Sequence, residues 1–230
     1  AERTRTGRFF RSQSWRWALW TLQCSMLHTL SKKALGVVTG ADRLPVELDP
    51  IQEKIDALGR PPRFHQKGTP EMRLQELGMT LPEASSALAK YSPVVLVGDL
   101  MHISGQLPRD AEGNLITGKV GPPLEGETDY KDVAAGAAAA RACAVQVLSQ
   151  LQGALGSLDR IVRLVKLTGF VNAAGAFDEH SKVIDGASQL MLDVFGEAGR
   201  GTRSSVGVAS LPLNCTVEVE ALFQIQLKST

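Results

Sequence analysis

Cysteine, histidine and aromatic residues are all scarce in this chain of 230 residues. The cysteines, Cys24, Cys143 and Cys215, form an odd set without CxxC spacing, which predicts neither a disulfide framework nor a zinc site. The four histidines are scattered and lack the spacing of metal ligands. We therefore expect a protein of a reducing compartment that holds no metal ion.

Acidic residues are absent between Arg3 and Gly40, where seven basic residues and all three tryptophans lie. This composition is typical of an organelle transit peptide, so we interpret residues 1–40 as a basic leader. A real leader predicts a mitochondrial or plastid protein, and otherwise we expect a cytoplasmic one. Two alternatives stay open, namely a spurious extension and a small interaction segment.

The leader also lacks a long hydrophobic run. Its apolar part, WALWTLQCSMLHTL, is interrupted by Gln23, Ser25 and His28 and falls short of the ~20 apolar residues that span a bilayer. We therefore expect no membrane anchor.

A linker rich in Pro, Gly and basic residues, GRPPRFHQKGTP (59–70), follows the leader. We assign residues 41–71 to the linker and 72–230 to a globular domain. That domain holds 13 Lys and Arg against 17 Asp and Glu, and aromatic residues make up only 5% of the chain. A mildly acidic domain with few rings for stacking is a poor ligand for RNA or DNA, so no nucleic-acid partner is expected.

Periodicity predicts an α+β domain. Two apolar runs joined by Gly98-Asp99 predict a β-hairpin over 92–106. Small and apolar residues at helical spacing predict helices over 133–155 and 177–195, and a β-branched run predicts a central strand over 161–172. The stretch 203–223 is interpreted as a second hairpin. The order predicts a mixed β-sheet with two helices packed on one face.

The last strand leaves a second, half-polar sheet face without a cover. One face carries Val217, Val219, Ala221, Phe223 and Ile225, and the other carries Glu218, Glu220, Leu222, Gln224 and Gln226. Because only one face can meet the helices, we expect the other to meet another copy of the chain or a ligand.

Four stretches of the domain resemble one known family. They are Tyr91 with GDLMHISGQLP (98–108), LGSLDRIVRLVKLTGFV (155–171), the run from KVIDGAS to VGVASLP (182–212), and VEVEALF (217–223). Tyr91 stands 13 residues before Ser104, and Arg203 stands 15 residues before Glu218. Both spacings match the YjgF/RidA family, also known as L-PSP or reactive intermediate imine deaminases, and the chain is similar to it over nearly all of 72–228.

The resemblance implies a chorismate-mutase-like fold, assembled as a homotrimer with clefts between subunits. It implies hydrolysis of small enamines and imines such as 2-aminoacrylate to 2-keto acids and ammonia, without a cofactor. Arg203 would bind the substrate carboxylate and Glu218 would position the attacking water. The substrate-binding residues carried over from the family are Tyr91, Ser104 and Gly105, to which we add Ser205.

Three positions depart from the family pattern. Ser205 and Gly207 stand where deaminating members have Cys and Glu, and Asp185 aligns with an Asn. A carboxylate facing an anionic substrate would be unfavourable, so Asp185 either points elsewhere or indicates another ligand.

Three alternative functions therefore stay open. The first is a noncatalytic module that binds a small carboxylate or keto acid. The second is an endoribonuclease or translation inhibitor, which the acidic domain disfavours. The third is a chorismate-mutase-like pericyclic enzyme, for which the sequence offers no obvious second cation beside Arg203.

Overall fold

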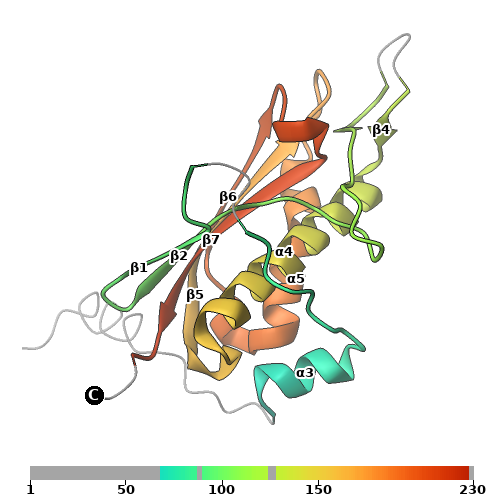
Figure 1. Ribbon diagram of the computed structural model, residues 1–230. Coiled ribbons are helices and arrows are strands. Elements are labelled where there is room, and N and C mark those ends of the chain that lie inside the picture. Colours follow the sequence, from blue (N-terminus) through green and yellow to red (C-terminus); the bar gives the residue numbers. More distant parts are fainter. Residues whose placement is uncertain (1–67, 87–89, 124–127, 228–230) are drawn as a thin grey trace, which may run out of the picture. The chain divides into compact units, whose positions relative to one another are not determined.

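The computed structural model describes residues 68–86, 90–123 and 128–227 (Figure 1). The predicted leader, and all but the last four residues of the predicted linker, lie outside these ranges. The main elements of the described chain are α3 (Pro70–Glu76), β1 (Val94–Val97), β2 (Leu100–Gln106), β3 (Lys119–Val120), β4 (Tyr130–Lys131), α4 (Val133–Leu155), β5 (Ile161–Asn172), α5 (His180–Phe195), β6 (Thr202–Val208) and β7 (Val217–Ile225).

Several predicted elements are confirmed. β1 and β2 pair as an antiparallel hairpin around Gly98, whose φ of 61° is the positive value that a tight turn requires. The Asp132 side chain caps α4 by accepting from the Ala135 N–H at 2.7 Å, and Gly156 ends this helix with a φ of 79°. α5 begins at His180, three residues later than its periodicity predicts.

The predicted hairpin over 203–223 is wrong. The five-stranded sheet has the order β1-β2-β7-β5-β6, so β5 lies between the two strands of that stretch. β6 pairs with β5 in parallel, and β7 pairs with β5 and β2 antiparallel. The apolar β5 needs partners at both edges, and α5 provides the crossover that a parallel pair requires. The turn-like residues 209–216 carry the chain across β5.

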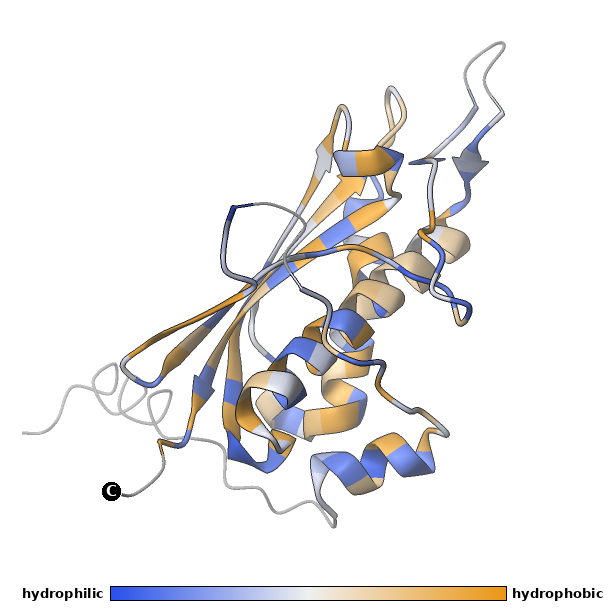
Figure 2. Ribbon diagram, viewed as in Figure 1, coloured by the Kyte–Doolittle hydropathy of each residue, from blue (hydrophilic) through white to orange (hydrophobic). Residues whose placement is uncertain are grey.

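The two long helices pack on one face of the sheet, as predicted (Figure 1). The strands alternate between hydrophobic and hydrophilic residues (Figure 2), and the hydrophobic set of β7 is buried against α4 and α5. The helices approach closely at Gly186, where a Cβ would lie 2.7 Å from the Ala137 carbonyl carbon. Only glycine allows this approach, which keeps α5 against α4.

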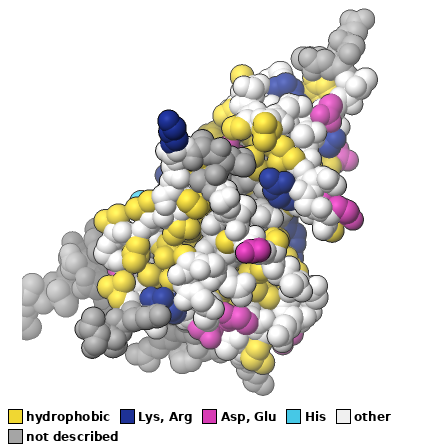
Figure 3. Space-filling view, viewed as in Figure 1, with side chains coloured by type: hydrophobic (Ala, Val, Ile, Leu, Met, Phe, Trp, Pro, Cys, Tyr) yellow, Lys and Arg dark blue, Asp and Glu magenta, His cyan; other side chains and the backbone are white. Residues whose placement is uncertain are grey.

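The other face of the sheet is uncovered within the described chain. Val95, Val97 and Val206 are 47%, 60% and 43% exposed. These side chains lie on the uncovered face, because Val206 is aligned with Phe170 and Val95 with His102, and both of these partners belong to that face. Hydrophobic side chains gather on the surface near the β1–β2 hairpin (Figure 3). An exposed apolar surface of this kind is typical of an interaction face.

A short helix that the periodicity did not predict, α3, begins at Pro70 and docks on the domain. Arg73 donates from Nη1 to the Val194 carbonyl at 2.8 Å. Glu71 accepts from the Leu158 N–H at 2.7 Å and from the Ser157 hydroxyl at 2.9 Å. The ordered domain therefore includes Pro70 and Glu71, just before the predicted boundary at residue 72. Within the described ranges, no helix is both long and apolar enough to cross a bilayer.

Candidate functional site

Glu218 on β7 lines a hollow of about 380 Å³, which we call the Glu218 hollow. β2, α4 and three connecting segments contribute its other walls. The lining residues used below are Tyr91, Ser104, Gly105, Arg109, Gln146 and Glu218. Three of the predicted substrate-binding residues thus meet one of the two predicted catalytic residues.

The Glu218 carboxylate lies directly over Gly105. A Cβ at position 105 would sit 2.7 Å from the carboxyl carbon Cδ and closer still to Oε1. The pairing of β2 with β7 shifts register between Ile103 and Gln106, which is the irregularity of a β-bulge. The bulge and the missing side chain together make room for the carboxylate beside the β2 backbone.

The protein raises the pKa of Glu218. Burial is the larger cause, because it disfavours the ionised carboxylate, and the negative charge of nearby Glu220 acts in the same direction. A carboxyl group with a raised pKa exchanges protons closer to neutral pH than an ordinary glutamate. This property suits a group that takes a proton from water during a reaction.

Ser104 is held by its neighbour Gln106. Gln106 donates from Nε2 to the Ser104 carbonyl at 3.0 Å and to the Ser104 hydroxyl at 3.3 Å. Tyr91 is 49% exposed and lies on the wall of the hollow. The hollow therefore offers a fixed hydroxyl, a carboxyl group and a phenol side chain that is half open to solvent.

Arg203 lies in a second hollow of about 580 Å³, the Arg203 hollow, between β6 and α5. Its side chain is 27% exposed and donates from Nη1 to Asp185 Oδ1 at 2.7 Å and to the Ser188 hydroxyl at 3.0 Å. Nε and Nη2 have no partner among the described residues, so one edge of the guanidinium is available. Asp185, which aligns with an Asn of the family pattern, thus forms an ion pair with Arg203.

One chain does not bring Arg203 and Glu218 together. Arg203 is aligned with the helix-facing Leu167, whereas Glu218 is aligned with Phe170 of the opposite face. The two residues are also separated by two strand spacings and three residues along the sheet, which places their backbones about 14 Å apart. A site that uses both side chains would need a second copy of the chain.

Ser205 and Gly207, the other departures, face α5. The Ser205 hydroxyl is buried and has no hydrogen-bond partner among the described residues, and Ser205 lines neither hollow. A Cβ on Gly207 would lie 2.9 Å from Cδ2 of His180. The imidazole of His180 therefore occupies the space that a side chain at position 207 would enter.

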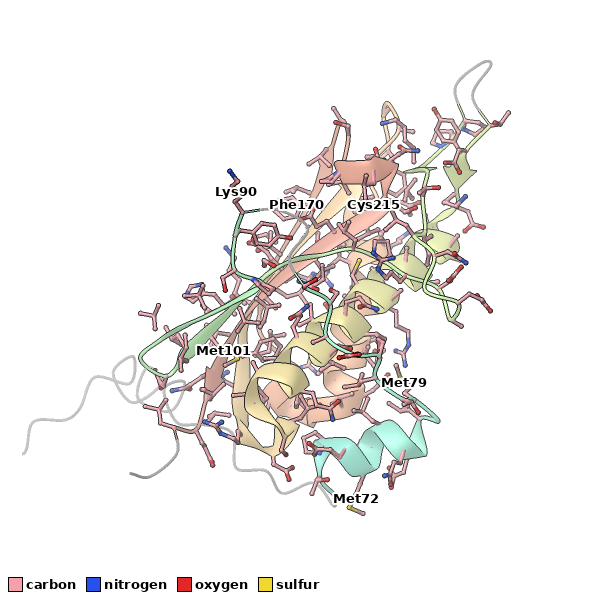
Figure 4. The ribbon with its side chains drawn as sticks, viewed as in Figure 1. Met72, Met79, Lys90, Met101, Phe170 and Cys215 are labelled. Carbon is pink, nitrogen blue, oxygen red and sulfur yellow. The ribbon has the colours of Figure 1, made fainter. Side chains whose placement is uncertain are left out.

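Both described cysteines are unsuited to nucleophilic catalysis. Cys215, just before β7 (Figure 4), is buried, and burial together with the charge of Glu218 raises its pKa to about 12. Cys143 is buried on α4, and burial raises its pKa as well. Thiols with raised pKa values stay protonated and weakly reactive. Within the described part of the chain, no cluster of three or more His, Cys, Asp or Glu residues could hold a metal ion.

Sequence reasoning missed Arg109 and Gln146 as residues of the Glu218 hollow. Arg109 falls outside every predicted helix and strand, and Gln146 lies within a helix whose pattern is dominated by small residues. Their approach to Glu218 depends on how α4 and the loop after β2 pack, for which a single sequence carries no local signal.

A mixed sheet with two helices on one face and a carboxylate over a strand glycine defines an α+β protein of the chorismate-mutase-like type. The family model described as "YjgF/chorismate mutase-like, putative endoribonuclease" matches residues 71–224. The chain belongs to the YjgF/RidA family.

Proteins from a trypanosome and two bacteria are similar over the same region. Protein TCP17 of Trypanosoma cruzi is 49% identical over 153 residues, which cover 66% of this chain and 91% of TCP17. The crystal structure of Atu1372 from Agrobacterium tumefaciens, a protein of unknown function, is 44% identical with a TM-score of 0.60, covering 69% of this chain and 94% of that chain. The crystal structure of a "putative endoribonuclease" from Shewanella oneidensis MR-1 is 37% identical with a TM-score of 0.62, covering 69% of this chain and 100% of that chain.

Proposed function

We propose that this protein hydrolyses small reactive enamines and imines, such as 2-aminoacrylate and its imine tautomer, to 2-keto acids and ammonia. The observation that carries the proposal is the Glu218 carboxyl group, which lies over Gly105 in a hollow and has a raised pKa. The fold family, in which the sequence resemblance places such chemistry, supports the same reaction.

The reaction needs a proton acceptor for water and a group that holds the substrate. The ionised Glu218 carboxylate takes a proton from the attacking water, whose oxygen bonds to the imine carbon. The C=N bond becomes a C–N single bond, and the nitrogen takes up the proton that Glu218 accepted. Transfer of the hydroxyl proton of the tetrahedral adduct to the amine nitrogen then breaks the C–N bond, releases ammonia and leaves a keto acid. The Ser104 hydroxyl, to which Gln106 donates, would hydrogen-bond the developing adduct.

The substrate carboxylate would be bound by Arg203 of a neighbouring copy. One edge of that guanidinium has no partner within the described chain, and Arg203 cannot reach the Glu218 hollow of its own chain. The uncovered sheet face, with Val95, Val97 and Val206 exposed, provides a surface on which copies can associate. We therefore propose a homotrimer whose clefts combine Glu218 of one copy with Arg203 of the next.

The Asp185–Arg203 ion pair favours one other function. A guanidinium that is already neutralised attracts an anionic substrate less strongly, and this matches a module that binds a carboxylate or keto acid without turnover. RNA cleavage is less compatible with the structure, because the domain carries more acidic than basic residues.

The proposed function is tested with imines generated in situ from alanine by an amino acid oxidase, followed by keto acid release above the spontaneous rate. We expect the wild-type protein to accelerate release and both Glu218→Gln and Arg203→Gln to abolish the acceleration. A protein that binds pyruvate but accelerates nothing would instead establish the noncatalytic module. RNA cleavage that both variants lose would establish the endoribonuclease.

A further inference from the structure

Arg109 is a second guanidinium of the candidate site, and it lines the Glu218 hollow. It lies on a tight loop after β2, where Ile116 N–H donates to the Pro108 carbonyl at 3.0 Å and Asn114 N–H donates to Asp110 Oδ1 at 2.7 Å. The Arg109 side chain is anchored to the same loop through Nη1, which donates to the Gly113 carbonyl at 2.7 Å. The loop therefore holds the guanidinium in place on the wall of the Glu218 hollow.

The charge of Arg109 is not neutralised within the described chain. No ion pair joins it to Glu218 or to any other described carboxylate, and Nε and Nη2 have no described partner. Other described arginines do pair with acids, as Arg141 does with Asp193 and Arg200 with Glu197. An anchored arginine with the Nε–Nη2 edge of its guanidinium unused is suited to bind a carboxylate.

Gln146 provides an independent observation in the same hollow. The residue is only 8% exposed, lines the hollow, and has no hydrogen-bond partner among the described residues. Gln150, one turn further along α4, donates instead to the Ser85 carbonyl at 2.7 Å. The Gln146 amide, which has no partner in the described chain, can therefore hydrogen-bond a polar group that enters the hollow.

We propose that Arg109 and Gln146 bind a second acidic group of the substrate, so that the protein acts on imines of amino acids with acidic side chains. This inference rests on the proposed function, in which Arg203 of a neighbouring copy already binds the first carboxylate. If the substrate has a single carboxylate and Arg203 binds it, the Arg109 guanidinium has no group of the substrate to bind. The reaction converts the imine of a dicarboxylic amino acid and one water into a 2-keto dicarboxylic acid and one ammonia.

The test compares imines generated in situ from aspartate and from alanine, with release of oxaloacetate or pyruvate as the readout. We expect kcat/KM for the aspartate-derived imine to exceed that for the alanine-derived imine by about tenfold, the gain of one charge-assisted contact. Arg109→Gln should reduce this ratio to about one, whereas Arg203→Gln should lower both rates. Arg160→Gln is the matched control, because Arg160 donates only to the Gln226 carbonyl, outside the hollow.

Calorimetric binding of succinate and butyrate provides a readout that does not depend on turnover. The wild-type protein should bind succinate more tightly, and Arg109→Gln and Gln146→Leu should each reduce that preference. A wild-type protein without preference for the diacid would overturn the inference, and so would an Arg109→Gln variant that loses both ligands equally. Turnover of the alanine-derived imine that depends on Glu218 would leave the proposed function standing in either case.

Discussion

The two hollows differ in how they treat their charged residue. In the Arg203 hollow the guanidinium forms an ion pair with the exposed carboxylate of Asp185 and remains partly open to solvent. In the Glu218 hollow the carboxyl group has no described partner, and its pKa is raised by burial and by Glu220. An exposed ion pair is weak and easily exchanged, whereas a half-buried carboxyl group without a partner is poised to react.

Neither hollow of a single chain contains both residues of the proposed catalytic pair, Arg203 and Glu218. The Arg203 hollow has a carboxylate binder beside a competing acid, and the Glu218 hollow has the proton acceptor. The sheet places the two on opposite faces. Assembly of copies through the uncovered face would combine what each hollow lacks.

The largest effect is expected from Glu218→Gln. An amide cannot accept the proton of the attacking water, so turnover should fall by about 10²- to 10⁴-fold, the usual contribution of a general base. Steady-state kinetics with the alanine-derived imine measures this loss. Glu220→Gln, on the same strand, is the matched control and should change the rate far less. Equal losses in the two variants would show that the hollow is not the reaction site.

The next effect is expected from Gly105→Ala. The new methyl group would overlap the Glu218 carboxylate and displace it, and a misplacement of about 1 Å can lower a rate by about 10²-fold. Measured in a Glu218→Gln background, the same substitution should add little, because it acts through that carboxylate. An undiminished rate in the single variant would refute the described placement of Glu218.

A smaller and opposite effect is expected from Asp185→Asn. Removing the acid releases the Arg203 guanidinium, so pyruvate should bind about two- to fivefold more tightly, in keeping with the modest strength of an exposed ion pair. Asp193, which lies on the same helix as Asp185, forms an ion pair with Arg141 of α4. Asp193→Asn breaks that pair and should leave pyruvate affinity unchanged. Weaker binding by Asp185→Asn would show that Asp185 itself holds the ligand.

The smallest effect concerns stability. A carboxyl group whose pKa is raised on folding favours the folded state below its unfolded pKa, and this contribution is lost as the pH rises through the folded value. Because the pKa of Glu218 is raised, Glu218→Gln should have a higher melting temperature than wild type near pH 7. The difference should shrink as the pH falls through the raised folded pKa of Glu218 towards the lower pKa of the unfolded chain. A variant that melts lower at neutral pH would contradict the desolvation of Glu218.

The sequence predicted local structure better than sheet order. Strand alternation and helix ends are encoded by neighbours, so β5 and α4 have their predicted bounds, and Asp132 and Gly156 are found at the predicted caps. The hairpin over 203–223 failed because the insertion of β5 between two nearby strands is a long-range pairing without a local signal.

The candidate site was predictable only in part. The family motifs identified Tyr91, Ser104, Gly105 and Glu218, which the fold brings into one hollow. The same comparison of motifs identified Asp185 as a departure. Arg109 and Gln146 were not predictable, because their approach depends on tertiary packing of a loop and a helix.

The most direct test of the shared site is subunit complementation. Arg203→Gln and Glu218→Gln variants, each inactive alone, are unfolded together, refolded as a mixture and assayed for imine hydrolysis. If one copy supplies Arg203 and another supplies Glu218, random assembly of equal amounts should restore about a quarter of the wild-type activity, because a cyclic oligomer pairs neighbours independently. Mixed oligomers, verified by mass spectrometry, that remain inactive would contradict the account.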